Sequence, residues 1–179
     1  MEIKKTNIEG LLLMQPLIHI DERGYFMESF KEDWFTKHFP AVNFIQDNES
    51  KSEYGVLRGL HFQKPPYAQT KLVRVIQGEI LDVAVDLRKD SSSYLQHQTF
   101  VLNETTKQQI LVPKGFAHGF VVLSKFAIVS YKVDAPYHYE SEMGIAWDDQ
   151  SLRINWGLSK EKIKLSNKDA NYSKFHPNI

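Results

Sequence analysis

The chain has 179 residues, 42% of them hydrophobic, which is enough for one substantial core and too short for two enzyme domains of ordinary size. Basic and acidic residues both number 22, so no overall charge attracts nucleic acid or an anionic membrane. The absence of cysteine excludes disulfides, thiolate catalysis and cysteine-bound metal. We therefore expect one domain over residues 1–179, with neither nucleic acid nor membrane as a partner.

The sequence shows neither the pattern of a membrane span nor that of a secretory signal. No apolar run approaches the length of a membrane span, and residues 1–5 lack the apolar stretch of a secretory signal. We therefore expect a cytoplasmic protein.

The first part of the chain predicts a hairpin and a helix. Residues 8–20 are apolar and end in a charged turn at residues 21–24, which leads into residues 25–30. This pattern predicts two strands around a turn. Residues 31–38 mix two aromatic residues with charged ones, which predicts a short helix ended by Pro40.

The middle of the chain is dense in β-branched residues, with turn signals at short intervals. The expected strands are residues 55–62, 71–77, 79–87, 98–102, 108–112 and 119–131. Alternation within residues 82–87 places Asp82 and Asp86 on one face, as in a barrel interior that holds a ligand. After Trp156 the chain is polar and lysine-rich, which predicts a peripheral helix or an irregular tail.

These elements predict an all-β fold. Many short strands with frequent turns are typical of a jelly-roll (cupin-like) barrel or sandwich, here with a few short peripheral helices. The periodicity leaves barrel and sandwich open.

A histidine in the strand at residues 55–62 is a candidate base. On an ideal strand Arg58 and His61 point to opposite faces, but Gly59 is a candidate bulge that would turn Arg58 to the same side. Imidazole, with an ordinary pKa of about 6.5, is the best side-chain proton acceptor at neutral pH. The alternative interpretation is a hydrogen-bonded histidine of the core.

Residues 113–120 carry a second histidine. Their Pro-x-Gly-x-x-His spacing resembles the second half of the metal-binding pattern of the cupin barrels. The first half would require His-x-His followed by Glu, whereas this chain has His61, Phe62 and Gln63. Two histidines without a close third ligand make a poor site for zinc or iron, so we expect no metal and no cofactor.

Seven motifs occur in order along nearly the whole chain. They are Asp21-x-Arg23-Gly24-x-Phe26-x-Glu28, Gln46-Asp47-Asn48, residues 58–63, residues 71–73, residues 82–88, residues 115–120 and Tyr131-Lys132. Together they resemble the dTDP-4-dehydrorhamnose 3,5-epimerase family. The resemblance implies a cofactor-independent isomerase of dTDP-rhamnose biosynthesis that acts on a dTDP-linked 4-keto-6-deoxy sugar. It also implies a homodimer, because in family members the strand carrying Arg23 to Glu28 commonly crosses to the neighbouring subunit.

The resemblance assigns a proton-transfer role to three residues. In the family, the histidine of the Arg-Gly-Leu-His segment removes the proton beside the 4-keto group, which implies His61 as the base. Residues 165–170 resemble the family's C-terminal segment, which implies Asp169 as its partner. The tyrosine of the Tyr-Lys pair, here Tyr131, is implied as the donor. Inversion needs this second group, because returning the proton on the same face restores the starting stereochemistry.

Further family positions stabilise the intermediate and bind the substrate. Lys71 and His118 correspond to the residues that stabilise the enolate. The positions that correspond to nucleotide, diphosphate and sugar contacts are Arg23, Phe26, Glu28, Gln46, Asn48, Arg58, Lys71, His118, Glu142 and Lys168.

One departure from the family leaves open which carbons of the sugar are inverted. Pro136 stands where relatives have an aromatic residue that lines the sugar site. The preferred reaction is epimerisation at C3 and C5 of dTDP-4-dehydro-6-deoxy-D-glucose to dTDP-4-dehydro-L-rhamnose. The alternatives are a C3-only epimerase of a related nucleotide sugar, a metal-dependent cupin enzyme that uses His61 and His118 as ligands, and a non-catalytic sugar-binding barrel.

Overall fold

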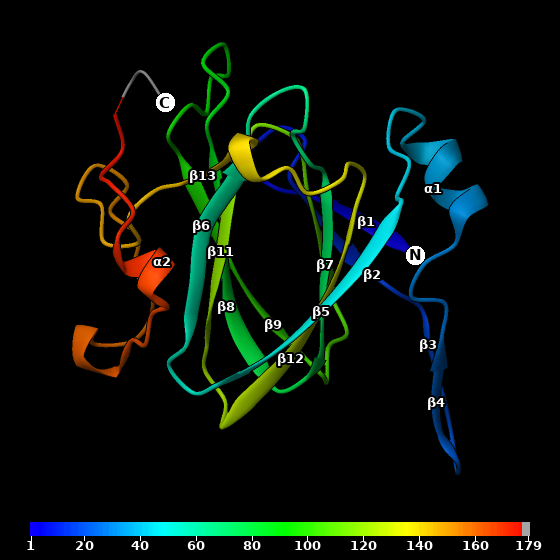
Figure 1. Ribbon diagram of the computed structural model, residues 1–179. Coiled ribbons are helices and arrows are strands. Elements are labelled where there is room, and N and C mark those ends of the chain that lie inside the picture. Colours follow the sequence, from blue (N-terminus) through cyan, green and yellow to red (C-terminus); the bar gives the residue numbers. More distant parts are fainter. Residues whose placement is uncertain (177–179) are drawn as a thin grey trace.

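The computed structural model describes residues 1–176, and in it two antiparallel sheets face each other (Figure 1). The six-stranded sheet has the order β1 (Glu2–Lys5), β2 (Leu12–Gln15), β10 (Gln109–Val112), β7 (Lys71–Gln77), β12 (Phe126–Val133) and β5 (Gln46–Glu53). The five-stranded sheet has the order β13 (Glu142–Gly144), β6 (Leu57–Gln63), β11 (Phe116–Val122), β8 (Glu79–Asp86) and β9 (His97–Asn103). The prediction of an all-β fold is confirmed, and the arrangement is that of a sandwich of two sheets.

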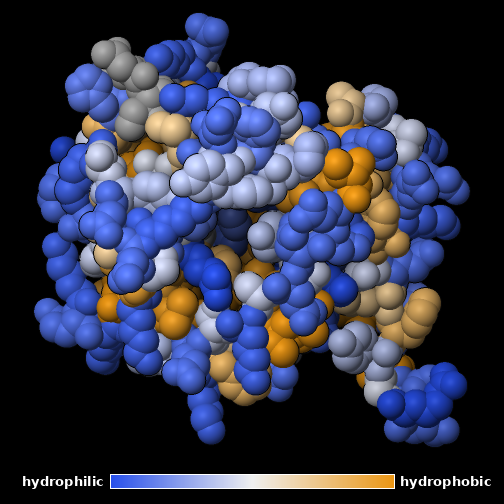
Figure 2. All heavy atoms as spheres, in the orientation of Figure 1, coloured by the Kyte–Doolittle hydropathy of each residue, from blue (hydrophilic) through white to orange (hydrophobic). Residues whose placement is uncertain are grey.

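The N-terminal segment adds a hairpin and a helix. Strands β3 (Ile18–Asp21) and β4 (Gly24–Met27) pair only with each other and project from the body, as Figures 1 and 2 both show. Helix α1 (Glu32–His38) follows and buries Phe35 against the outer face of the six-stranded sheet. The predicted hairpin and helix are thus confirmed. The run at residues 8–20 holds two strands rather than one, because Pro16 lacks the N–H that would continue a ladder.

Two further differences from the predicted strands have local causes. The run at residues 119–131 is wrong as a single strand, because the chain reverses between β11 and β12, where the Ser124 hydroxyl donates to the Phe126 carbonyl at 2.7 Å. Strand β5 was not predicted, because its polar side chains show no apolar alternation. It lies at the edge of its sheet, where few apolar residues are needed.

Besides the cluster around Phe35, the core has one layer between the sheets and another on the outer face of the five-stranded sheet. Ala84 belongs to the inner layer, whereas Val83 and Val85 pack outward. The outer layer is covered by the C-terminal segment, which carries the short helices η2 (Lys160–Lys162) and α2 (Asn167–Ala170). The prediction of a peripheral tail after Trp156 is confirmed. Another short helix, η1 (Tyr139–Ser141), precedes β13. Among residues 1–176, no helix is both long and apolar enough to cross a membrane.

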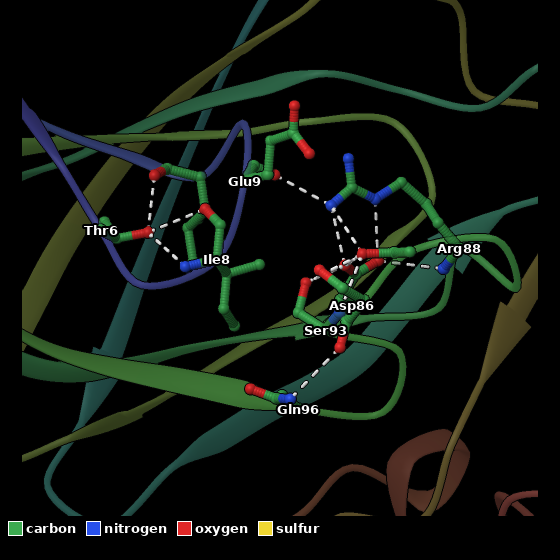
Figure 3. A network of polar contacts seen from close by, with 10 residues as sticks. Thr6, Ile8, Glu9, Asp86, Arg88, Ser93 and Gln96 are labelled. Atoms are coloured by element: carbon green, nitrogen blue, oxygen red, sulfur yellow. Dashed lines mark hydrogen bonds and ion pairs between the residues drawn. The ribbon is translucent and has the colours of Figure 1, made fainter.

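A buried carboxylate ties the N-terminal loop to the end of β8 (Figure 3). Arg88 donates to both oxygens of Asp86, at 2.8 and 2.7 Å, and also to the Glu9 carbonyl at 2.8 Å. The Ser91 and Ser93 hydroxyls also donate to this carboxylate, at 2.6 and 2.7 Å. Burial by itself raises the pKa of Asp86, but the hydrogen bonds outweigh it and lower this pKa to about 2.

Candidate active site

A bulge in β6 brings Arg58 and His61 to the same side of the strand. His61 lies opposite His118 on β11, and Arg58 lies opposite Phe120, so three steps along β6 match two along β11. Gly59, with a φ of +122°, forms the bulge, and a Cβ there would lie 2.5 Å from the Gly119 Cα. The predicted bulge is confirmed, and glycine is the residue that fits it.

Two adjoining hollows between the sheets share His61, Lys71 and Tyr131. The outer hollow, of about 330 Å³, is also lined by Gln46, Asn48, Phe62, Gln63, Gln69, Tyr137 and Glu142. The inner one, of about 140 Å³, is also lined by Ser50, Arg58, His118, Gly119, Phe120 and Val129. We call the two together the catalytic cavity. It holds polar and titratable groups from both sheets, which suits a charged or sugar-like ligand better than an apolar one.

His61 is held by the C-terminal segment. Its Nε2 lies 2.5 Å from Oδ1 of Asp169, which α2 carries against β6. The other carboxylate oxygen accepts a 2.7 Å hydrogen bond from the Ser166 hydroxyl. Burial raises the pKa of Asp169, but the hydrogen bonds from His61 and Ser166 outweigh it and hold this pKa below its ordinary value. With Nε2 donating to a charged carboxylate, Nδ1 is the ring nitrogen left to accept a proton.

A second histidine–carboxylate pair lies deeper in the cavity. His118 Nε2 is 2.9 and 3.0 Å from the two oxygens of Asp82, which is fully buried on β8. The prediction of an inward-facing acid at position 82 is confirmed. Lys71 lies near this pair, and burial lowers its pKa to about 8, although Asp82 and Glu142 oppose the shift. The cavity therefore contains donors suited to an oxygen that gains negative charge.

Tyr131 belongs to β12 of the opposite sheet and lines the same cavity as His61. Burial raises the pKa of its phenol, while the nearby Arg58 opposes the rise. A phenol of raised pKa keeps its proton at neutral pH and can give it only to a strong base. A proton acceptor and a proton donor thus come from facing sheets.

The structure places the other predicted residues in two groups. Gln46, Asn48, Arg58 and Glu142 line the catalytic cavity, and Lys168 forms an ion pair with Glu142 at its rim. The residues on and after the hairpin, Arg23, Phe26 and Glu28, do not line this cavity in their own chain. The side chain of Arg23 is 85% exposed and its ion pair is with Asp21. Their predicted contact with the nucleotide stays a prediction.

Sequence reasoning missed two tyrosines of the site. Tyr137 lines the outer hollow and donates to Glu142 at 2.7 Å. Its position next to Pro136, where an aromatic residue was expected, was the available signal. Tyr172 contacts the His61 ring edge to face, with the ring centroids 5.5 Å apart. It lies in the polar tail, where the sequence gives no signal.

Each of the two histidines that line the cavity has a carboxylate partner. His61 and His118 each use Nε2 to hold a separate carboxylate. Within residues 1–176, no three histidine, aspartate or glutamate side chains gather in a way that would hold a metal ion.

The sequence matches the family described as dTDP-4-dehydrorhamnose 3,5-epimerase over residues 5–177. A relative of that name from Methanothermobacter thermautotrophicus is 47% identical over 175 residues, covering 97% of this chain and 94% of the relative. The solved structure of a dTDP-6-deoxy-D-glucose-3,5-epimerase from Legionella pneumophila, in complex with dTDP-4-keto-L-rhamnose, is 44% identical with a TM-score of 0.92, covering 97% of this chain and 92% of that one. An epimerase structure from Elizabethkingia anophelis is equally similar, at 44% identity and a TM-score of 0.92, with coverage of 97% and 96%.

Proposed function

Because the chain belongs to the dTDP-4-dehydrorhamnose 3,5-epimerase family, we propose that its catalytic cavity inverts C3 and C5 of dTDP-4-dehydro-6-deoxy-D-glucose to give dTDP-4-dehydro-L-rhamnose. The protein is an isomerase of dTDP-rhamnose biosynthesis. The observation that carries the residue assignment is that His61, paired with Asp169, and Tyr131 line one cavity from opposite sheets.

The first step is removal of a proton beside the ketone. Nδ1 of His61 accepts the proton from the carbon next to the 4-keto group, and the negative charge moves to the ketone oxygen as an enolate. Asp169 stabilises the imidazolium that results, and it fixes the ring tautomer before the reaction. Lys71 and His118 stabilise the enolate oxygen, because positive charge and donors held in place favour the charged intermediate.

The second step returns a proton to the opposite face of the same carbon. Tyr131 donates from the facing sheet, which inverts the configuration. The enolate is basic enough to take the proton of a phenol whose pKa burial has raised. His61 then releases its proton to solvent, and the Tyr131 phenolate takes one up from solvent. With both groups reset, the same pair acts at the second carbon on the other side of the ketone, so that a single base and a single donor perform both inversions.

The nucleotide contacts require a second copy of the chain. We place Arg23, Phe26 and Glu28 in the partner's cavity within a homodimer, with Gln46, Asn48, Glu142 and Lys168 of the receiving chain around the same substrate. The proposal is supported by the projecting hairpin, whose Ile20 and Phe26 are 81% and 67% exposed. An arginine guanidinium suits the diphosphate, and an aromatic ring suits the base. A cytoplasmic location stays a prediction, which cell fractionation tests.

Proton NMR of the purified protein with dTDP-4-keto-6-deoxyglucose in heavy water tests the proposed reaction. Deuterium incorporation at both C3 and C5, with formation of the L-sugar, is the expected result. Incorporation at C3 alone would replace the proposal with a C3-only epimerase. Binding without any exchange would indicate a sugar-binding barrel, and loss of activity on chelation with stoichiometric bound metal would indicate a metal-dependent enzyme.

A further inference from the structure

His61 has neighbours on both sides within the five-stranded sheet. In the strand register it lies between His118 on β11 and Gly144 on β13. Side chains that pair across antiparallel strands point to the same face and contact each other. On the β11 side His118 provides such a neighbour. On the β13 side, glycine provides no side chain at all.

The ring of Tyr172 occupies the space beside Gly144. A Cβ added to Gly144 would lie 2.3 Å from Cζ of Tyr172 and 2.4 Å from each of its Cε atoms. The same ring meets the His61 imidazole at 5.5 Å between centroids, with an angle of 67° between the planes. This is the edge-to-face arrangement that aromatic pairs favour. Tyr172 therefore stands where a cross-strand neighbour of His61 would otherwise be.

The hydrogen bond to Asp169 leaves the tilt of the imidazole ring unconstrained. A single contact at Nε2 fixes the position of that nitrogen, but the ring can still tilt about it, and a tilt moves Nδ1 away from the substrate. A second contact on the flank of the ring removes this freedom. Asp169 and Tyr172 lie three residues apart in the same C-terminal segment, so one segment supplies both contacts.

We infer that Tyr172 is a positioning residue for the base: its ring, seated on Gly144, holds the His61 imidazole with Nδ1 directed into the catalytic cavity. The inference rests on the proposed function, and it adds a residue that does not touch the reacting atoms. Small errors in the placement of a catalytic group are costly, since rate depends steeply on the distance and angle of attack.

Replacement of Tyr172 separates its ring from its hydroxyl. Tyr172→Ala is expected to lower kcat about three- to tenfold with KM little changed, because an edge-to-face contact of this kind is lost while substrate contacts remain. Tyr172→Phe keeps the ring and is expected to restore kcat to within about twofold of the wild type. Tyr139→Ala, which removes a tyrosine that is 80% exposed, is the matched control and should leave kcat unchanged.

Gly144 provides an independent test through a double-mutant cycle. Its backbone has no positive φ, so alanine is compatible with the local conformation, but the new methyl group must displace the Tyr172 ring. Gly144→Ala should therefore lower kcat when Tyr172 is present and have little further effect in Tyr172→Ala. Additive losses in the double variant would overturn the inference, because they would mean that the two residues act separately.

A spectroscopic measurement keeps the inference testable apart from turnover. Carbon-13 relaxation of the His61 ring should report one fixed ring orientation in the wild type and Tyr172→Phe and a more mobile ring in Tyr172→Ala, while Asp169 holds the same tautomer in all three. Identical ring relaxation and identical kcat in Tyr172→Ala would refute the positioning role. If the wild type itself fails to exchange deuterium, the proposed function fails instead, and the ring relaxation still decides whether Tyr172 orients the ring.

Discussion

His61 Nε2 lies 2.5 Å from Oδ1 of Asp169, although 108 positions separate the two residues in the chain. The imidazole belongs to β6, and the carboxylate belongs to a helix of only four residues that contacts this strand from the C-terminal segment. In the proposed mechanism, the base is therefore oriented only when the tail has folded against the sheet. Proton transfer would then depend on the last part of the chain as much as on the sandwich.

Removal of the imidazole should abolish exchange at every position. His61→Ala is expected to lower the rate of deuterium incorporation at C3 and C5 by about 10²–10⁴-fold, because the group proposed to remove the proton beside the ketone is then missing. Proton NMR in heavy water measures both rates, and His176→Ala, an exposed histidine, is the control. Residual exchange near the wild-type rate would remove His61 from the mechanism.

Removal of the phenol should separate exchange from inversion. Tyr131→Phe retains His61 and Asp169, so the proton next to the ketone still exchanges with solvent, while delivery from the opposite face is lost. We expect deuterium incorporation to continue and formation of the L-sugar to fall by about 10²-fold or more. Deuterium incorporation and formation of the L-sugar are both followed in one NMR time course. A variant that forms product at the normal rate would exclude Tyr131 as the donor.

At alkaline pH, the exchange rate should depend on whether Lys71 is protonated. Burial lowers the pKa of Lys71 to about 8, so its ammonium is charged below that pH and is lost as pH rises through it. The exchange rate should therefore fall above about pH 8, because the enolate loses a cationic partner. Lys71→Arg, whose guanidinium stays charged, should shift this fall to higher pH.

Tyr131→Phe provides the control for that assignment, since burial raises the pKa of Tyr131 away from this range. The fall in exchange should persist in this variant. Its disappearance there would assign the alkaline limb to the phenol and contradict the assignment to Lys71.

Asp86 should contribute to stability in a pH-dependent way. Its pKa in the folded protein is about 2, below the ordinary 3.8, so the stabilisation is complete above pH 4 and is lost as pH falls toward 2. The difference in unfolding free energy between wild type and Asp86→Asn should shrink by about 2 kcal/mol over that interval. Urea unfolding at several pH values measures it, with the exposed Asp90→Asn as control. A difference that is constant with pH would contradict the prediction.

Mixed dimers should show whether the hairpin acts on the partner. His61→Ala and Arg23→Ala each impair both sites of their own homodimer. In a heterodimer of the two, one cavity combines an intact His61 with an intact Arg23 from the other chain, so about half of the wild-type activity should return. Differently tagged chains allow the heterodimer to be isolated. No recovery in the isolated heterodimer would mean that Arg23 does not serve the neighbouring cavity.

The sequence predicted those parts of the fold and site that local patterns record. The alternation around Asp82 placed this acid inward, and Gly59 indicated the bulge that turns Arg58 toward His61. Strand β5 was missed because an edge strand with polar side chains on both faces shows no apolar period. Its Asn48 still entered the predicted site, through a motif rather than through a predicted strand.

Contacts between segments that lie far apart in the chain could not be predicted from local sequence patterns. Tyr172 meets His61 only because the C-terminal segment wraps around the edge of β6, and nothing in its polar surroundings indicates that contact. The pairing of His118 with Asp82 likewise depends on the register between β8 and β11. Register is set by the packing of whole strands and by turns, so a pattern within one strand does not reveal it.

The C-terminal segment also covers part of the edge of the five-stranded sheet beside β6. Strand β13 is short, and beyond it the backbone of β6 bonds instead to Ile145 and Lys164, whose carbonyls accept from Leu60 at 3.3 Å and Leu57 at 2.9 Å. A strand border with unpaired N–H groups is a template on which other chains can add and aggregate. The tail that carries Asp169 thus also closes part of this border through Lys164, and we expect a truncation that removed it to leave a protein prone to precipitation as well as an inactive one.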